Sequence, residues 1–337
     1  MGEAEAWTIS IAAAIVPTVV YVLILWWFDR YEKEPRRLLW VAFLWGAVPA
    51  VILSVIAEQV LGEPLAGLSE QSAELMSSSV LAPLVEELAK GLAVFLLFLF
   101  FRKEFDNVLD GIIYGATIGF GFAMTENVFY FMDSLRQGGL EGLSTLVFMR
   151  GVVFGLNHAL FTSVFGAALG YARMSRRRLR RWIAPLLGLL GAMLLHGVHN
   201  LFASLSDAVC FGLFISIASD WGGVLVILVV LWLSARQEKR WIATYLRPEV
   251  NTGLITQQDY DMISSYRNRQ AALWRARLRL DGREVRRVSQ LTQLATELAF
   301  KIQQGDVKVA EKLRQQIAGL SGSVPVGSPG GPAQPAA

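Results

Sequence analysis

The chain has 337 residues, of which 54% are hydrophobic and 18% are charged, and its formal net charge is +3. Average soluble domains carry about 25% charged residues, so this composition excludes an ordinary soluble protein, a disordered chain and a collagen-like repeat. A single cysteine, Cys210, excludes an internal disulfide framework. The small net charge gives no reason to expect nucleic acid as a partner.

Seven apolar stretches dominate the first two thirds of the chain. A helix of about 20 apolar residues can span a bilayer, and each stretch has about that length. They are Thr8–Phe28, Leu38–Leu61, Ser79–Phe101, Val108–Met132, Leu146–Tyr171, Trp182–Leu205 and Val209–Ser234. The first follows Glu3 and Glu5 without any basic residue, unlike a cleaved secretory signal. The sequence therefore predicts an all-α, multi-pass membrane bundle of seven transmembrane helices.

Basic residues alternate between the loops that join these stretches. The loops after the first, third, fifth and seventh stretches are rich in Lys and Arg, whereas the other loops hold only Arg136. Cytoplasmic loops carry an excess of Lys and Arg. We therefore predict that the N-terminus lies outside, the C-terminus lies in the cytoplasm, and the protein resides in the plasma (inner) membrane.

The composition changes after Ser234. We interpret residues 1–234 as the transmembrane domain, residues 235–320 as a helical cytoplasmic tail and residues 321–337 as disordered. Asp281-Gly282 and Gly305-Asp306 mark breaks between tail helices. The tail has 16 Lys and Arg against 9 Asp and Glu, which favours anionic lipid of the inner leaflet as a partner. An ordinary solvated helical hairpin explains the tail equally well.

The third apolar stretch carries two adjacent carboxylates and a lysine, in the segment Pro83–Lys90 (PLVEELAK). Charged groups inside a membrane are costly, so they mark candidate functional sites. Lys90 follows Glu86 by four residues and Glu87 by three, and either pair can meet on one helix surface. We expect Lys90 to hold one carboxylate while the other stays available for chemistry. A salt-bridged helix end in the headgroup region is the alternative.

Further polar groups lie in the fourth, fifth and sixth stretches. They are Glu126, Asn127, Arg150, Asn157, His158, His196, His199 and Asn200. At about 1.5 Å of rise per residue, nearly all of these groups and the glutamate pair fall in the outward half of their helices. This depth predicts one water-containing pocket that opens toward the outer face. Asp106 and Asp110, at the cytoplasmic end of the fourth stretch, are interpreted as capping or solvated residues.

Carboxylates, imidazoles and an amide without a thiol favour the activation of water. A buried carboxylate can take a proton from water, and an imidazole with Asn200 can stabilise the oxyanion of an attacked carbonyl. Two histidines and a carboxylate could instead hold a divalent metal such as zinc. The candidate metal ligands are Glu87, Glu126, His158 and His196. The sequence contains neither an HExxH nor a GxSxG motif.

Two functions of other classes fit the same residues less well. A proton-coupled transporter also uses buried Glu and His side chains, but its relay should reach both faces, and many transporters have inverted repeats. The sequence shows no internal repeat. A non-catalytic membrane scaffold acting through the basic tail would make the tail essential and the carboxylates dispensable.

Four elements of the chain resemble the motifs of the PrsW family of bacterial intramembrane proteases and, more distantly, of the CAAX-processing protease superfamily. They are Glu86-Glu87-x-x-Lys90, Phe122-x-x-x-Glu126-Asn127, His158 and His196-x-x-x-Asn200, in this order between about Pro17 and Leu205. The resemblance implies a membrane-embedded endopeptidase that makes the first, site-1-type cut in a membrane-bound anti-sigma factor. Two positions depart from the superfamily. Its first motif commonly ends in Arg with three residues between it and the Glu pair, whereas here Lys90 comes after two, and its second commonly ends in His where Glu126 stands here.

These considerations assign expected roles within the candidate set. Glu86 or Glu87 is the expected general base toward water, and Lys90 orients its neighbour. His196 and Asn200 are expected to bind the oxyanion. Glu126, with its neighbour Asn127, and His158 are expected to assist in proton transfer or in metal binding. The expected substrate is a peptide bond of a membrane protein.

Overall fold

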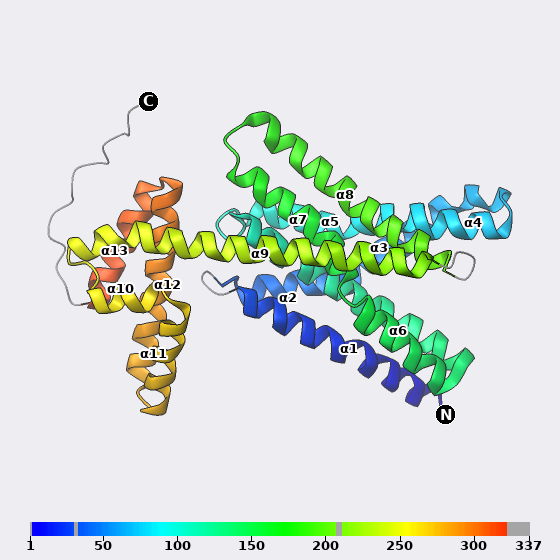
Figure 1. Ribbon diagram of the computed structural model, residues 1–337, viewed down its shortest axis with the longest axis horizontal. Helices are drawn as coiled ribbons and strands as arrows, with labels where there is room; N and C mark the ends of the chain where they lie inside the picture. The colour runs from blue at the N-terminus through cyan, green and yellow to red at the C-terminus, as the bar shows by residue number, and fades with distance from the viewer. Residues whose placement is uncertain (1, 30–32, 207–210, 322–337) are drawn as a thin grey trace. The chain divides into compact units, whose positions relative to one another are not determined.

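The computed structural model describes residues 2–29, 33–206 and 211–321, and in those ranges it contains helices and helical turns but no strand (Figure 1). Its compact units are Met1–Asp29 with Glu34–Ser234, and Arg30–Lys33 with Ala235–Ala337. Five helical stretches of the described part are long and apolar enough to cross a membrane. These are Glu3–Phe28, Arg36–Gly62, Val108–Met174, Arg178–Ser204 and Gly212–Asn251. The architecture agrees with the predicted all-α membrane protein.

The count of five differs from the seven predicted segments for two physical reasons. The fourth and fifth predicted segments count as one stretch, Val108–Met174, although the chain reverses at Gly139 and leaves the helix at residues 154–156. The third predicted segment contains only a 19-residue α-helix, and Glu86, Glu87 and Lys90 make it too charged to qualify by apolar composition.

Nine α-helices begin in the described part of the first unit. They are α1 (Glu3–Phe28), α2 (Arg36–Trp45), α3 (Val51–Gly62), α4 (Glu70–Met76), α5 (Ala82–Phe100), α6 (Val108–Phe148), α7 (Asn157–Met174), α8 (Arg178–Ser204) and α9 (Gly212–Asn251). Wider π turns interrupt the helical path at Gly46–Ala50, Ser77–Leu81 and Met149–Val153. The first of them contains Pro49, which removes a backbone donor and displaces the preceding carbonyl.

Helix α6 starts at a capping box and reverses at a glycine. The Asn107 side chain accepts the backbone N–H groups of Leu109 and Asp110, and the Asp110 carboxylate accepts that of Asn107. The capping interpretation of Asp110 is thereby confirmed. Gly139 has φ +62° inside α6, a conformation that side chains rarely tolerate. The chain turns back there and leads toward α7.

The predicted fifth helix is broken in the structure. The π turn Met149–Val153 is followed by the non-helical residues 154–156, and α7 begins only at Asn157. His158 therefore lies in the first turn of a helix instead of the middle of one. At the close approach of α6 and α7, a Cβ on Gly119 would lie 2.3 Å from the carbonyl oxygen of His158. Only glycine fits there, so Gly119 fixes the depth at which α7 presents His158.

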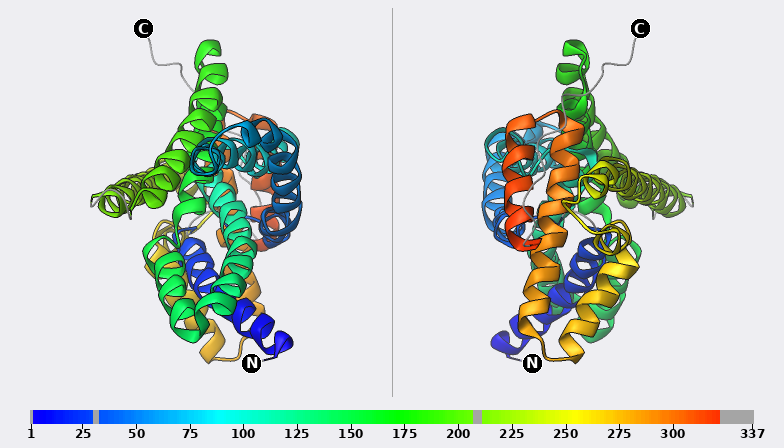
Figure 2. Two further views of the ribbon diagram at one scale, coloured as in Figure 1. Left: turned by 90° about the vertical axis from the view of Figure 1, so that its right-hand side faces the viewer. Right: turned by 90° about the vertical axis from the view of Figure 1, so that its left-hand side faces the viewer.

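Helix α1 lies along α6 in all three views (Figures 1 and 2). Their interface buries Ala6 and Ala14 of α1 against Phe131, Met132 and Leu135 of α6. A second apolar cluster joins α5, α6 and α7 through residues that include Val94, Tyr114 and Phe165. These clusters hold the helices that carry the polar residues in fixed positions.

The second unit is built from the end of α9 and four further helices. These are α10 (Gln257–Ile263), α11 (Tyr266–Leu278), α12 (Gly282–Gln304) and α13 (Val307–Ser321). Helices α12 and α13 pack side by side (Figure 2) and bury Leu291, Leu298 and Ile317 together with Ile242 and Leu246 of α9. Of the segment 321–337 that we interpret as disordered, residues 322–337 lie outside the described residues.

Glu34, between α1 and α2, is buried against other carboxyl groups. The Tyr114 hydroxyl donates a hydrogen bond to it, and Asp29 and Asp110 lie close by. Burial, followed by the negative charge of Asp110, raises the pKa of the Glu34 carboxyl well above its usual value. The folded protein therefore keeps a proton that the unfolded chain releases, so the free energy of unfolding falls as pH rises above the ordinary glutamate pKa.

A Glu34→Gln variant is expected to be at least as stable as the wild type near neutral pH, and its stability should depend less on pH. The amide keeps a carbonyl oxygen that can accept from Tyr114 and never has to ionise. Thermal unfolding of both proteins in one detergent, from about pH 5 to about pH 8, measures the difference. A variant whose melting temperature falls as steeply with pH as that of the wild type contradicts this assignment.

Candidate active site

The first turns of α5 place three charged groups together in the protein interior. The Lys90 Nζ lies 2.6 Å from Glu87 Oε1 and 3.2 Å from Glu86 Oε2. All three side chains are buried. Lys90 thus contacts both carboxylates, where the sequence suggested that it would hold one and leave the other free. Its ammonium also lies 4.2 Å from the centre of the Phe122 ring, a cation–π contact supplied by α6.

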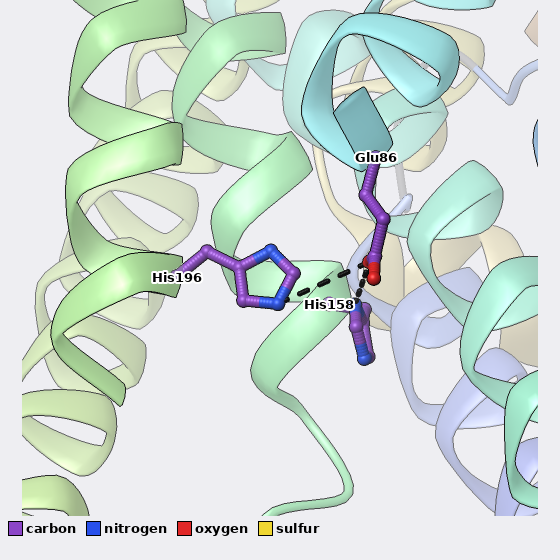
Figure 3. Close-up of side chains that lie close together, drawn as sticks. All are labelled: Glu86, His158 and His196. Atoms are coloured by element: carbon purple, nitrogen blue, oxygen red, sulfur yellow. Dashed lines mark ion pairs between the residues drawn. The ribbon is translucent and has the colours of Figure 1, made fainter. Parts of the chain in front are cut away.

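Two histidines, from α7 and α8, lie next to the Glu86 carboxylate of α5 (Figure 3). His196 places Nδ1 3.1 Å from Glu87 Oε1 and Nε2 3.9 Å from Glu86 Oε2. His158 places Nδ1 3.8 Å from the same Glu86 oxygen. The His196 ring stacks on Phe161 at a centroid distance of 4.8 Å, which fixes its plane. Both imidazoles therefore aim one nitrogen at Glu86.

Helix α6 supplies the second acidic group of the site. Glu126 Oε2 lies 2.9 Å from His158 Nε2 and 2.5 Å from the Arg150 Nη2. The Asn127 Oδ1 accepts a hydrogen bond of 2.6 Å from Arg150 Nε. Arg150, in the π turn before α7, thus holds both α6 side chains. Sequence reasoning named Arg150 among the intramembrane polar residues but gave it no role.

These groups border a cavity of about 720 Å³. Of the predicted site residues, the ones that line it are Glu86, Glu126, Asn127, His158, His196 and Asn200. Glu87 and Lys90 are buried behind this lining. Glu86 and Glu87 are thereby distinguished, because only Glu86 of the pair lines the cavity.

Asn200 lies on the cavity wall but is engaged with the backbone of a neighbouring turn. Its Nδ2 donates a hydrogen bond of 2.8 Å to the carbonyl oxygen of Ser78. The same turn packs closely against α8, since a Cβ on Gly197 would lie 2.6 Å from the Ser79 carbonyl oxygen. The π turn Ser77–Leu81 therefore bridges Asn200 on α8 and the start of α5.

One buried ion pair of the site escaped sequence reasoning. Asp220 on α9 places Oδ2 2.7 Å from His199 Nδ1, and Ser216 Oγ lies 2.7 Å from the same nitrogen. The Asn157 Nδ2 lies 3.2 Å from His199 Nε2. His199 and Asn157 both line the cavity. A lone aspartate in an otherwise apolar stretch was the available signal.

The donor set offers a place for a divalent cation. One ligand atom each from Glu86, His158 and His196 lie within 4.8 Å of one another. The nitrogens of the two imidazoles that face away from Glu86 contact Glu126 and Glu87, an arrangement typical of metal-binding histidines. The Lys90 Nζ lies 3.1 Å from His158 Nδ1, so a cation at these donors requires the ammonium to withdraw toward Glu87.

Comparison with known proteins gives a consistent result. The model of a family described as "PrsW family intramembrane metalloprotease" matches residues 34–235. A "Protease PrsW" of Geobacillus kaustophilus is 27% identical over 247 residues, 71% of this chain and 94% of that protein. The protein of this name from Bacillus subtilis is 28% identical over 216 residues, 64% of this chain and 92% of its own. The protein of this name from Clostridioides difficile is 30% identical over 223 residues, which are 65% of this chain and 85% of that protein.

No solved structure matches the chain. The family match covers more than half of the sequence and includes every described residue that lines the cavity. The resemblance drawn from the four short motifs is confirmed, and so is the assignment as a membrane protein and a protease. The chain belongs to the PrsW family of intramembrane proteases.

Proposed function

We propose that the protein hydrolyses a peptide bond of a membrane-protein substrate in the 720 Å³ cavity, with Glu86, His158 and His196 as the reaction centre. The observation that supports this proposal is the convergence of one carboxylate and two imidazoles, from three different helices, on the wall of a single cavity. Peptide hydrolysis needs a group that holds water and a group that takes its proton.

Glu86, His158 and His196 would hold a divalent cation such as zinc. Two imidazoles and a carboxylate form a set that leaves a coordination position open for catalysis. When bound, the cation would polarise the substrate carbonyl and lower the pKa of water. The word metalloprotease in the description of the family supports this assignment.

The surrounding carboxylates act by holding the two rings. Glu87 holds His196 at Nδ1 and Glu126 holds His158 at Nε2, which turns the remaining nitrogens toward Glu86. Glu87 is therefore a positioning residue. With a cation held at the site, Glu86 would serve as a ligand, and Glu126, on the same cavity wall, would be the carboxylate left to accept a proton. In a site without a cation, Glu86 Oε2 takes that proton.

Asn200 is the proposed donor toward the oxyanion of the attacked carbonyl. Its amide N–H donates to Ser78 in the present structure, so the donor must turn toward the cavity when a substrate binds. Without a cation, His196 shares this role. The proposed substrate class is a single-span membrane protein, such as an anti-sigma factor cut on the outer side. The family resemblance of the motifs supports that class.

Cleavage by the purified protein tests the proposal. The protein is reconstituted with a panel of tagged single-span membrane proteins, anti-sigma factors among them, with and without a zinc chelator. We expect cleavage that the chelator abolishes and added zinc restores. Metal content measured by mass spectrometry should fall from about one zinc per chain to near zero in a His158→Ala variant.

The outcomes separate the two forms of the proposal. Cleavage that a chelator leaves unchanged, in a protein without bound metal, assigns the proton transfer to Glu86 alone. Products that appear equally with the wild type and with a His158→Ala, His196→Ala double variant of normal expression overturn the reaction centre.

A further inference from the structure

The end of the α11–α12 hairpin in the second unit combines exposed apolar and basic side chains. Trp274, Leu278 and Leu280 are 62%, 66% and 92% exposed. Arg275, Arg277 and Arg279 alternate with them and are also exposed. We call these six residues the hairpin tip. We propose that the hairpin tip inserts into the surface of a membrane that contains anionic lipid.

Two of the apolar residues of the tip, Trp274 and Leu278, share one side of α11. Trp274 and Leu278 are four residues apart on α11, so they are neighbours on the helix surface. The opposite face of α11 packs inward through Ala276 and the buried Arg269. Large apolar side chains that project into solvent usually mark a contact with a partner or a membrane.

Leu280 is held in a conformation that leucine seldom adopts. Its φ is 53°, and it is the one described non-glycine residue with positive φ. A branched side chain in this region is strained, whereas glycine would fit without cost. The turn therefore projects a leucine into solvent where backbone geometry favours glycine.

The positive charge of the tip favours an anionic partner. In the described part of the chain, no carboxylate forms a hydrogen bond or an ion pair with the guanidinium groups of Arg275, Arg277 and Arg279. The nearby Asp281 caps α12 by accepting the N–H groups of Arg283 and Glu284. Arginines around Trp and Leu are typical of segments that lie in the interface of anionic membranes.

The second unit is joined directly to an apolar helix that is long enough to cross a membrane. Helix α9 continues from its apolar part past Ser234 into the second unit without a break. The unit is therefore tethered to the bilayer, and the cost of bringing the tip to the lipid surface is small. The α11–α12 hairpin ends away from α10 and α13 of its own unit (Figure 1).

The test uses the full-length protein in lipid nanodiscs, with an environment-sensitive fluorophore on an introduced cysteine. Cys210, the sole native cysteine, is replaced by Ser. Gly282→Cys places the label beside the tip, and Gly319→Cys on α13 is the matched control. A Cβ at either glycine meets no atom within 4 Å, so both labels are sterically tolerated.

We expect a blue shift and a clear rise in emission of the Gly282 label when phosphatidylglycerol replaces part of the phosphatidylcholine. Spin-labelled lipid should quench this emission, and high salt should reverse the shift. Replacing the three tip arginines with Gln should return the emission to its value in neutral discs. Leu280→Gly should weaken the response without loss of stability, because it relieves the positive φ. The Gly319 label should not respond.

Three results overturn the proposal. The first is an emission of the Gly282 label that is equal in neutral and anionic discs. The second is a response that survives the loss of all three tip arginines. The third is a blue shift of the Gly282 label that appears only when two copies of the protein share a disc. This result would assign the tip to a contact between proteins.

Discussion

A Glu86→Gln variant is expected to lose at least about 100-fold in kcat for peptide cleavage, since positioned acid–base and ligand groups contribute about 10²–10⁴-fold. Gln keeps the size of the side chain but can neither take a proton from water nor bind a cation as a carboxylate does. Glu86 is the one member of the α5 glutamate pair that lines the cavity. Cleavage of a reconstituted single-span substrate, followed over a range of substrate concentrations, measures the loss. We expect kcat to fall and KM to stay unchanged.

Glu58→Gln is the matched control for this experiment. Glu58 lines the same cavity but is not part of the three-residue donor set. The control should retain most of the activity, which separates a local loss of chemistry from a general loss of negative charge. Full cleavage by Glu86→Gln and by Glu87→Gln, each at normal expression, would falsify the assigned roles of both carboxylates.

Lys90→Met is expected to destabilise the protein by about 3–5 kcal/mol, the usual effect of removing one partner from a buried ion pair. The Lys90 side chain is fully buried and lies within 3.2 Å of both α5 carboxylates. Its loss leaves two carboxylates in the interior without their cation. Thermal unfolding in detergent should show a large fall in Tm, and Lys103→Met, at an exposed lysine, should change Tm little.

A rescue distinguishes this electrostatic effect from a packing defect. Adding Glu86→Gln and Glu87→Gln to Lys90→Met removes all three charges together, so most of the lost stability should return. If the triple variant melts as low as Lys90→Met alone, the lysine stabilises the bundle through its packing and not through its charge.

Local contacts of the site follow from sequence spacing. Three- and four-residue spacings predicted that Lys90 can meet Glu87 and Glu86, and both contacts are present. The choice between the two carboxylates could not be predicted. Adjacent residues point about 100° apart on a helix, and only the neighbouring helices decide which one faces the cavity.

Other features depend on contacts between distant segments. Asp220 and His199 are on different helices, so no residue spacing along one helix reveals the pair. The break before Asn157 lies in an apolar run, and the packing of α7 against Gly119 offers a physical account of its position. The reversal at Gly139 was readable from the adjacent Gly138, because paired glycines favour turns.

The three donors of the reaction centre come from α5, α7 and α8, in chain order. A nascent chain emerging from the ribosome therefore lacks a complete centre until α8 has been synthesised and inserted. Truncated or half-inserted copies hold at most two of the three groups. Under the proposed mechanism, late assembly of this kind would confine bond cleavage to finished molecules and would protect other newly made membrane proteins from a premature hydrolase.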